Sequence, residues 1–155
     1  MMNWSTILPP KNNDYEGHPL ALYFLVFIAL RNTFRGIVHY FAPDGGSGII
    51  AGIPIETYSE GAVQTIIALF GAMGVGHLVE AVLVWLVILR YRSMIPFAYL
   101  CLMATQVLGI ALIAVKPLPV LPPGHVSLYV LAPLSLGFFL LSIRSPAADG
   151  GRPAR

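Results

Sequence analysis

The sequence predicts an all-α polytopic membrane protein, a bundle of four transmembrane helices with a glycine-rich outer loop between the first two. Of the 155 residues, 57% are hydrophobic and 10% are charged, whereas ordinary soluble domains carry about 25% charged residues. The mean hydropathy is +0.77, and four apolar runs in the chain are long enough to cross a bilayer, which takes about 20 residues. So few charged side chains cannot cover a soluble globule of this size, and a single membrane domain is predicted.

The N-terminal region, residues 1–18, is predicted to be a polar tail or a short segment at the membrane surface. It lacks the basic and apolar segments of a signal peptide, so no cleaved signal is expected. The first transmembrane helix is predicted over residues 19–41. Pro19 suits a first helical turn, where its missing N–H has no intrahelical partner, and Pro43 with the glycines after it stops the helix.

A glycine-rich connection, residues 42–60, forms the longest predicted loop. Its glycines resemble a phosphate-binding loop only superficially, because no Lys-Ser or Lys-Thr pair follows them as it does in a Walker motif. The apolar segment IIAGIPI is expected instead to dip into the membrane interface and to cover the bundle as a lid.

Three further apolar spans complete the predicted bundle, at about residues 62–89, 94–115 and 125–143. The first of these exceeds the length that a bilayer requires, so it is expected to tilt or protrude. Pro133 predicts a kink in the last span. The predicted organisation is a polar tail (1–18), a four-helix transmembrane domain (19–143) and a flexible basic tail (144–155).

Basic residues near the ends of the spans predict the orientation in the membrane. Arg90 and Arg92 lie between the second and third spans and Arg144 follows the fourth, whereas the opposite side carries Lys116 and acidic residues. The positive-inside rule then places both termini in the cytoplasm. We therefore expect a multi-pass protein of the plasma (inner) membrane.

Polar side chains at one depth form the predicted site. Counted from the cytoplasmic ends at about 1.5 Å per residue, four of them lie roughly 15 to 20 Å deep. They are Arg31, His77, Glu80 and Gln106. Because each is costly in lipid, the sequence predicts an ion pair between Arg31 and Glu80, with His77 and Gln106 completing the hydrogen bonds.

A basic stripe on the first span predicts a ligand. Arg31, Arg35 and His39 are spaced four apart and therefore share one helical face. The two arginines, Arg31 and Arg35, outnumber the one intramembrane carboxylate, Glu80. The excess of positive charge predicts an amphiphilic or lipid-like ligand with an acidic or carbonyl head. Its predicted binding residues are Arg31, Arg35, His39 and Gln106.

Two other functions stay open. His77 and Glu80 share a helical face and are candidate acid–base groups of an isomerase, cyclase or hydrolase acting on an apolar substrate within the membrane. Alternatively, the chain is an accessory subunit or a homo-oligomer, because a stripe of small residues lets another helix approach closely. The stripe comprises Gln64, Ala68, Ala72, Gly76 and Glu80.

The sequence favours neither a metal centre nor nucleic-acid binding. His77 and Glu80 lack the further ligands of a zinc or di-iron site, so neither a metal nor another cofactor is predicted. For haem, the estimated depths of His39 and His77 differ by about 10 Å, which argues against that pair, whereas His39 with His125 stays open. No basic cluster interleaved with aromatic residues indicates a nucleic-acid partner. A lone cysteine, Cys101, forms no intramolecular disulfide.

Overall fold

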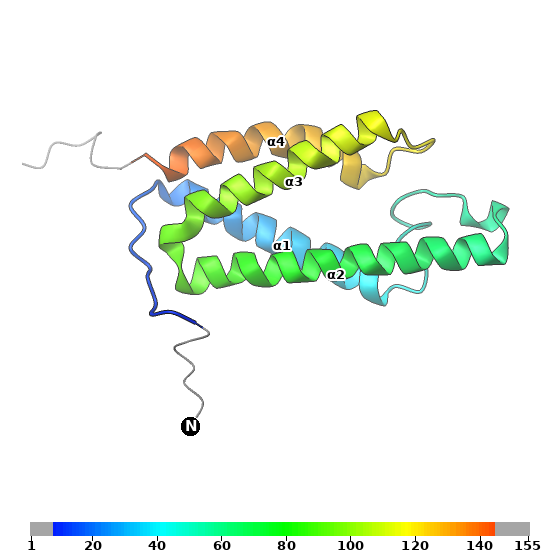
Figure 1. Cartoon of the computed structure of the whole chain (residues 1–155), viewed down its shortest axis with the longest axis horizontal. Helices are drawn as coiled ribbons and strands as arrows, with labels where there is room; N and C mark the ends of the chain where they lie inside the picture. Colours follow the sequence, from blue (N-terminus) through cyan, green and yellow to red (C-terminus); the bar gives the residue numbers. More distant parts are fainter. Residues whose placement is uncertain (1–7, 145–155) are drawn as a thin grey trace, which may run out of the picture.

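Four long helices lying side by side make up the protein (Figure 1), in a computed structural model that describes residues 8–144. Residues 1–7 and 145–155 of the two predicted tails lie outside the described residues. The elements in order are α1 (Pro19–Phe41), η2 (Ile55–Thr57), α2 (Glu60–Arg90), η3 (Arg92–Met94), α3 (Ile95–Val115) and α4 (Pro123–Ser142). Residues 8–144 contain no strand, and the predicted all-α fold is confirmed.

The surfaces of the four helices are those of a multi-pass membrane protein. Each helix is long and apolar enough to cross a bilayer. Each also exposes large apolar side chains, such as Tyr23, Val82, Leu108 and Val130. Apolar exposure on this scale is unusual in soluble monomers, and it fits helices surrounded by lipid.

Local chemistry explains where the helices begin. His18 caps α1, because its Nδ1 accepts a hydrogen bond from the Leu20 N–H at 3.2 Å. Prolines occupy the first turns of α1, α3 and α4, where a missing N–H removes no helical hydrogen bond. Pro133 lies inside α4, and the kink there stays a prediction.

The helices pack as two antiparallel hairpins, α1 with α2 and α3 with α4, and α1 also packs against α4. At one end, which we call the terminal end, residues 8–18 cross the bundle. The His18 N–H donates to the Leu141 carbonyl at 3.0 Å, and the Asn12 N–H donates to the Arg90 carbonyl at 3.1 Å. The opposite end, the loop end, carries the 42–59 connection, which lies beside the start of α2 (Figure 1). Residues near both ends of the described chain therefore share the terminal end.

Glycines set the close approach of α1 and α2. A Cβ at Gly74 would lie 2.8 Å from the Tyr40 backbone nitrogen, and one at Gly36 would lie 2.7 Å from the Leu78 Cγ. The buried residues of α2 are Gly74, Ala81, Val84 and Ile88, the spacing of a left-handed coiled-coil seam. The small-residue stripe predicted from the sequence lies on a different face, where Gln64, Ala68, Ala72 and Gly76 are exposed.

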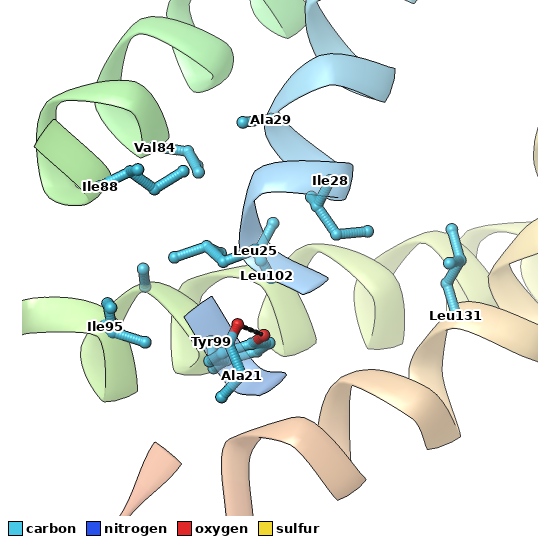
Figure 2. Packing of buried hydrophobic residues seen from close by; sticks show 11 residues of the cluster. Ala21, Leu25, Ile28, Ala29, Val84, Ile88, Ile95, Tyr99, Leu102 and Leu131 are labelled. Carbon is cyan, nitrogen blue, oxygen red and sulfur yellow. Dashed lines mark hydrogen bonds between the residues drawn. The ribbon is translucent and has the colours of Figure 1, made fainter. Parts of the chain in front are cut away.

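The hydrophobic core fills the terminal half of the bundle (Figure 2). It draws side chains from all four helices, namely Ala21, Leu25, Ile28, Val84, Ile88, Ile95, Tyr99, Leu102 and Leu131, among others. The Tyr99 hydroxyl donates to the Ala21 carbonyl at 2.6 Å, the contact dashed in Figure 2. This half of the bundle is thus filled with side chains, and the cavity described next lies in the other half.

Candidate ligand-binding cavity

A cavity of about 650 Å³ lies in the loop half of the bundle. Its walls come from α1, the first half of α2, the 42–59 connection, the 116–122 connection and the start of α4. Most of its lining is apolar, including Phe34, Ile66, Leu69, Phe70 and Met73. Small-molecule sites are typically about 300–1,000 Å³ and mostly apolar with a few polar groups, so size and lining suit a ligand.

The predicted basic stripe of α1 lines this cavity. Arg31, Arg35 and His39 all contribute to its wall, because residues four apart share a helical face. Of the three, Arg31 lies farthest along α1 from the 42–59 connection. Its Nη2 donates to the Ser127 Oγ at 2.7 Å, and that hydroxyl donates to the Gly124 carbonyl at 2.7 Å. The Arg31 guanidinium is therefore tied to the first turn of α4.

Arg35 differs from Arg31 in having no hydrogen bond or ion pair with any residue of 8–144. Its guanidinium lies against the start of α4, where a Cβ at Gly124 would meet the Arg35 Nη2 at 2.9 Å. A guanidinium carries five N–H donors and no acceptor. Arg35 therefore brings a cation and its donors to the cavity wall.

The His39 ring joins the cavity to the α1–α2 contact. Its Nδ1 lies 2.7 Å from the Gly45 carbonyl oxygen, which can only accept, so Nδ1 carries the proton and Nε2 of the neutral ring is an acceptor. The ring lies edge-on to Phe70, with centroids 5.5 Å apart. It also stacks on His77 at a centroid distance of 6.0 Å.

The contact between His39 and His77 corrects the depth estimate, which separated them by about 10 Å. Helical side chains lean towards the N-terminus of their own helix. Because α1 and α2 are antiparallel, the two rings lean towards each other along the bundle. His125 also lines the cavity, and its pairing with His39 at a haem stays a prediction.

The predicted ion pair between Arg31 and Glu80 does not form in the structure. Arg31 bonds to Ser127 instead, and the basic group beside Glu80 is the Nδ1 of His77, 3.9 Å from the carboxylate. Depth along the bundle does not specify the direction in which a side chain leaves its helix, and Arg31 reaches α4.

The predicted acid–base pair lies behind the cavity rather than in its wall. The side chains of His77 and Glu80 are 19% and 30% exposed, and neither lines the cavity. The Nε2 of His77 is buried without a hydrogen-bond partner among residues 8–144. The stacked ring of His39 is the group between this pair and the cavity.

Gln106 lies outside the cavity lining. It is buried between α3 and α4, and its Nε2 donates to the Ser135 Oγ at 2.9 Å. Its Oε1 has no partner among the described residues. The structure thus gives Gln106 a contact between helices, and its role in ligand binding stays a prediction. Sequence reasoning missed Ser127, because a single serine at the start of a span carries no periodic signal.

The 42–59 connection covers the loop end of the cavity with Ile50, Ala51 and Ile53. The carboxylate of Asp44 organises it by accepting three backbone N–H groups at 2.8 to 3.1 Å, those of Gly46, Gly48 and Ile49. These hydrogen bonds favour the ionised carboxylate and hold the pKa of Asp44 below its ordinary value. Gly45, Gly46 and Gly52 have positive φ angles, which glycine adopts without a steric penalty.

Comparisons with protein-family models, curated proteins and solved structures found no match to this chain. Among residues 8–144, no three His, Cys, Asp or Glu side chains are grouped as metal ligands. The chemistry of the cavity itself therefore carries the functional argument: two guanidinium groups and two imidazoles in a mostly apolar wall.

Proposed function

We propose that this protein binds an amphiphile with an anionic head in the cavity, within the plasma (inner) membrane and with both termini cytoplasmic. The observation that carries the proposal is Arg35, a cation in the cavity wall without a hydrogen bond or ion pair to residues 8–144. A partly buried charge is stabilised by an opposite charge, and an anionic head supplies one.

The local charge balance supports an anion. Arg31 and Arg35 both line the cavity, and no carboxylate among the described residues does so. The carboxylate of Glu80 lies 3.9 Å from the His77 Nδ1 and outside the cavity lining, so the two guanidinium groups line the cavity without a carboxylate beside them. Guanidinium groups bind carboxylates and phosphates through paired, charge-assisted hydrogen bonds. A phosphate or carboxylate head fits this arrangement.

The apolar part of the wall supports an amphiphile rather than a small soluble anion. Phe34, Leu69, Phe70 and Met73 line the cavity beside the basic groups. Contact with an alkyl chain removes apolar surface from water at about 25 cal/mol per Å². A ligand with one charged end and one apolar end contacts both parts of the wall.

The proposal is tested by native mass spectrometry of the delipidated protein titrated with lysophosphatidic acid, palmitate and an uncharged monoacylglycerol. Arg35→Gln is expected to weaken binding of the two anionic ligands at least roughly tenfold, because hydrogen bonds to charged groups contribute about 1.5–3 kcal/mol. Binding of the monoacylglycerol changes little.

Lys116→Gln is the matched control, because Lys116 is an exposed cation in the loop half that does not line the cavity. It should bind all three ligands as the wild type does. Equal binding of the anionic ligands by the wild type and a folded Arg35→Gln variant would contradict the proposal.

Acid–base catalysis on the bound ligand is a second candidate, favoured by the stacking of His39 on His77. Glu80 lies 3.9 Å from His77, whose ring stacks on His39 in the cavity wall, so the carboxylate would stabilise positive charge on the two imidazoles when His39 takes up a proton. In this case His39 Nε2 exchanges a proton with the ligand. Glu80→Gln would then retain the ligand but stop its conversion, as measured by mass spectrometry of extracted lipids.

A further inference from the structure

The cavity opens sideways between membrane-spanning helices, and we propose that its ligand is an anionic lipid of the surrounding bilayer that enters head first and leaves its acyl chain in the membrane. This inference rests on the proposed function and adds the source of the ligand and its orientation. Four observations support it: the rim, the absence of packing between α2 and α4, the apolar border at the loop end, and the depth of Arg35.

The exposed residues at the rim of the cavity are apolar or aromatic, and they come from α1, α2, the two connections and the start of α4. Phe34 and Leu69 both line the cavity, yet each is 65% exposed. Met73, one helical turn further along α2, also lines it and is partly exposed. Side chains that face both the cavity and the surroundings mark its mouth. Because these side chains stand on spanning helices, the mouth faces lipid rather than water.

The arrangement of helices leaves room for this mouth. α2 and α4 each pack along α1, but they are not packed along each other. The two walls of the cavity that come from α2 and from the start of α4 are therefore joined through α1, α3 and the connections, and not by packing of α2 along α4. A lateral gap between such walls gives a lipid access to Arg35 without unfolding a helix.

The loop end has an apolar border that is held in place by hydrogen bonds. Exposed residues of the two connections line the cavity there, namely Ile50, Tyr58, Leu118 and Val120. Ser47 and Ala51 are buried, and Asp44 holds this part of the connection through three backbone hydrogen bonds. The contact of His39 with the Gly45 carbonyl ties the same segment to α1. A charged solute from the aqueous phase meets these apolar side chains at the loop end, whereas the acyl chain of a lipid is compatible with them.

The depth of Arg35 sets the orientation of the lipid. Arg35 lies six residues before Phe41, the last residue of α1, which corresponds to about 9 Å along the helix. The head therefore lies inside the protein and below the end of α1, beside Arg35 and Arg31. The acyl chain leaves past Phe34 and Leu69 into the bilayer. Because the chain is not enclosed, binding depends on head charge and hardly on chain length.

The test uses the full chain in phosphatidylcholine nanodiscs that contain a minor fraction of phosphatidic acid with short, medium or long acyl chains. Native mass spectrometry of protein ejected from the nanodiscs measures how much phosphatidic acid stays bound. Expressing lipid as a mole fraction of the bilayer removes differences in partitioning from water. We expect equal retention for the three chain lengths to within about twofold, and roughly tenfold less in Arg35→Gln.

A variant at the mouth provides the second arm. Leu69→Trp narrows the mouth and is expected to lower retention, whereas Leu83→Trp is the control, because Leu83 is an exposed residue of the same helix outside the cavity. An excess of inorganic phosphate should leave retention unchanged. Displacement by phosphate would overturn the lipid source, and it would identify a site for a free anion.

The outcomes separate this inference from the proposed function. Retention that depends on Arg35 but is restricted to one chain length would mean an enclosed chain, and would overturn sideways entry while preserving recognition of the head. Equal effects of Leu69→Trp and Leu83→Trp would also overturn it. Retention that is unchanged in Arg35→Gln would instead overturn the proposed function itself.

Discussion

Arg31 and Arg35 lie on one helical face but differ in their hydrogen-bond partners. Their spacing predicts a shared face, and both line the cavity. Arg31 finds a hydroxyl partner in Ser127 of α4, whereas Arg35, one turn further along, meets Gly124, which has no side chain to accept its donors. The residue opposite each guanidinium thus decides which cation is left for a ligand.

Asp44 is expected to make the cover of the cavity sensitive to acid. Its folded-state pKa is lowered from 3.8 by the backbone N–H groups of Ile49, Gly46 and Gly48. A lowered carboxyl pKa contributes stability that is fully present above the unfolded value, about 3.9. This contribution is lost as the pH falls through the folded value. The cover should therefore be intact at neutral pH and loosen only in strong acid.

Asp44→Asn should reproduce this loosening at neutral pH. An amide lacks the charge that strengthens the three hydrogen bonds, so hydrogen exchange of the Gly46, Gly48 and Ile49 amides is expected to accelerate roughly tenfold, which corresponds to about 1.4 kcal/mol. Glu56→Gln, an exposed position of the same connection, serves as the control and should leave these rates unchanged. Unaltered exchange in Asp44→Asn would show that other contacts hold the cover.

The helix α2 presents two faces that both contain small residues, and the structure uses only one of them. Gly74 faces α1 at backbone distance, whereas a Cβ at Gly76 would meet nothing within 4 Å. The exposed stripe of Ala68, Ala72 and Gly76 is available to a partner helix, as the accessory-subunit hypothesis requires. That hypothesis stays a prediction.

Substituting the two glycines should separate the packing inside the chain from packing against a partner. Gly74→Ala is expected to destabilise the protein by about 1–3 kcal/mol, the usual range for overpacking, because its Cβ would lie 2.8 Å from the Tyr40 nitrogen. Gly76→Ala should be neutral or stabilising by up to about 1 kcal/mol through helix propensity. Unfolding in mixed micelles, followed by circular dichroism, measures both changes; equal losses would mean that the Gly76 face is also packed.

The bundle as a whole is divided between a packed half and a hollow half. Core side chains from all four helices fill the terminal half, while the loop half holds the cavity. His18, the cap of α1, donates a backbone hydrogen bond to Leu141 near the end of α4. The terminal half therefore anchors the fold, and the loop half is free to hold a ligand.

The orientation of this arrangement is expected to place the terminal end in the cytoplasm, because Arg90 and Arg92 lie there. The test replaces Cys101, which is exposed, by serine and introduces one cysteine at a time. Ile49→Cys, in the exposed part of the 42–59 connection, should react with a membrane-impermeant thiol reagent in intact cells. Ser93→Cys should react only after permeabilisation; the reverse pattern would invert the topology.

The bounds of the helices followed from the chain alone to within two residues, because hydrophobic length, prolines and glycines act locally. Residues 19–41 were predicted as the first span, and α1 occupies Pro19–Phe41. The basic stripe could likewise be predicted from the sequence, since a spacing of four places side chains on one face whatever surrounds the helix. The sequence predicted a shared pocket for these side chains, but it did not predict which other segments form the walls.

The partners of these side chains depend on how each helix is rotated and offset against its neighbours. The sequence of a single span determines neither the rotation nor the offset. The stacking of His39 on His77 depends on the close α1–α2 contact at Gly36 and Gly74. The bond of Arg31 to Ser127 depends on how α4 packs against α1. The depth of a residue can be counted along one helix, whereas a contact depends on the relative positions of two helices. Packing between distant segments therefore determines which cation is paired and where the cavity opens.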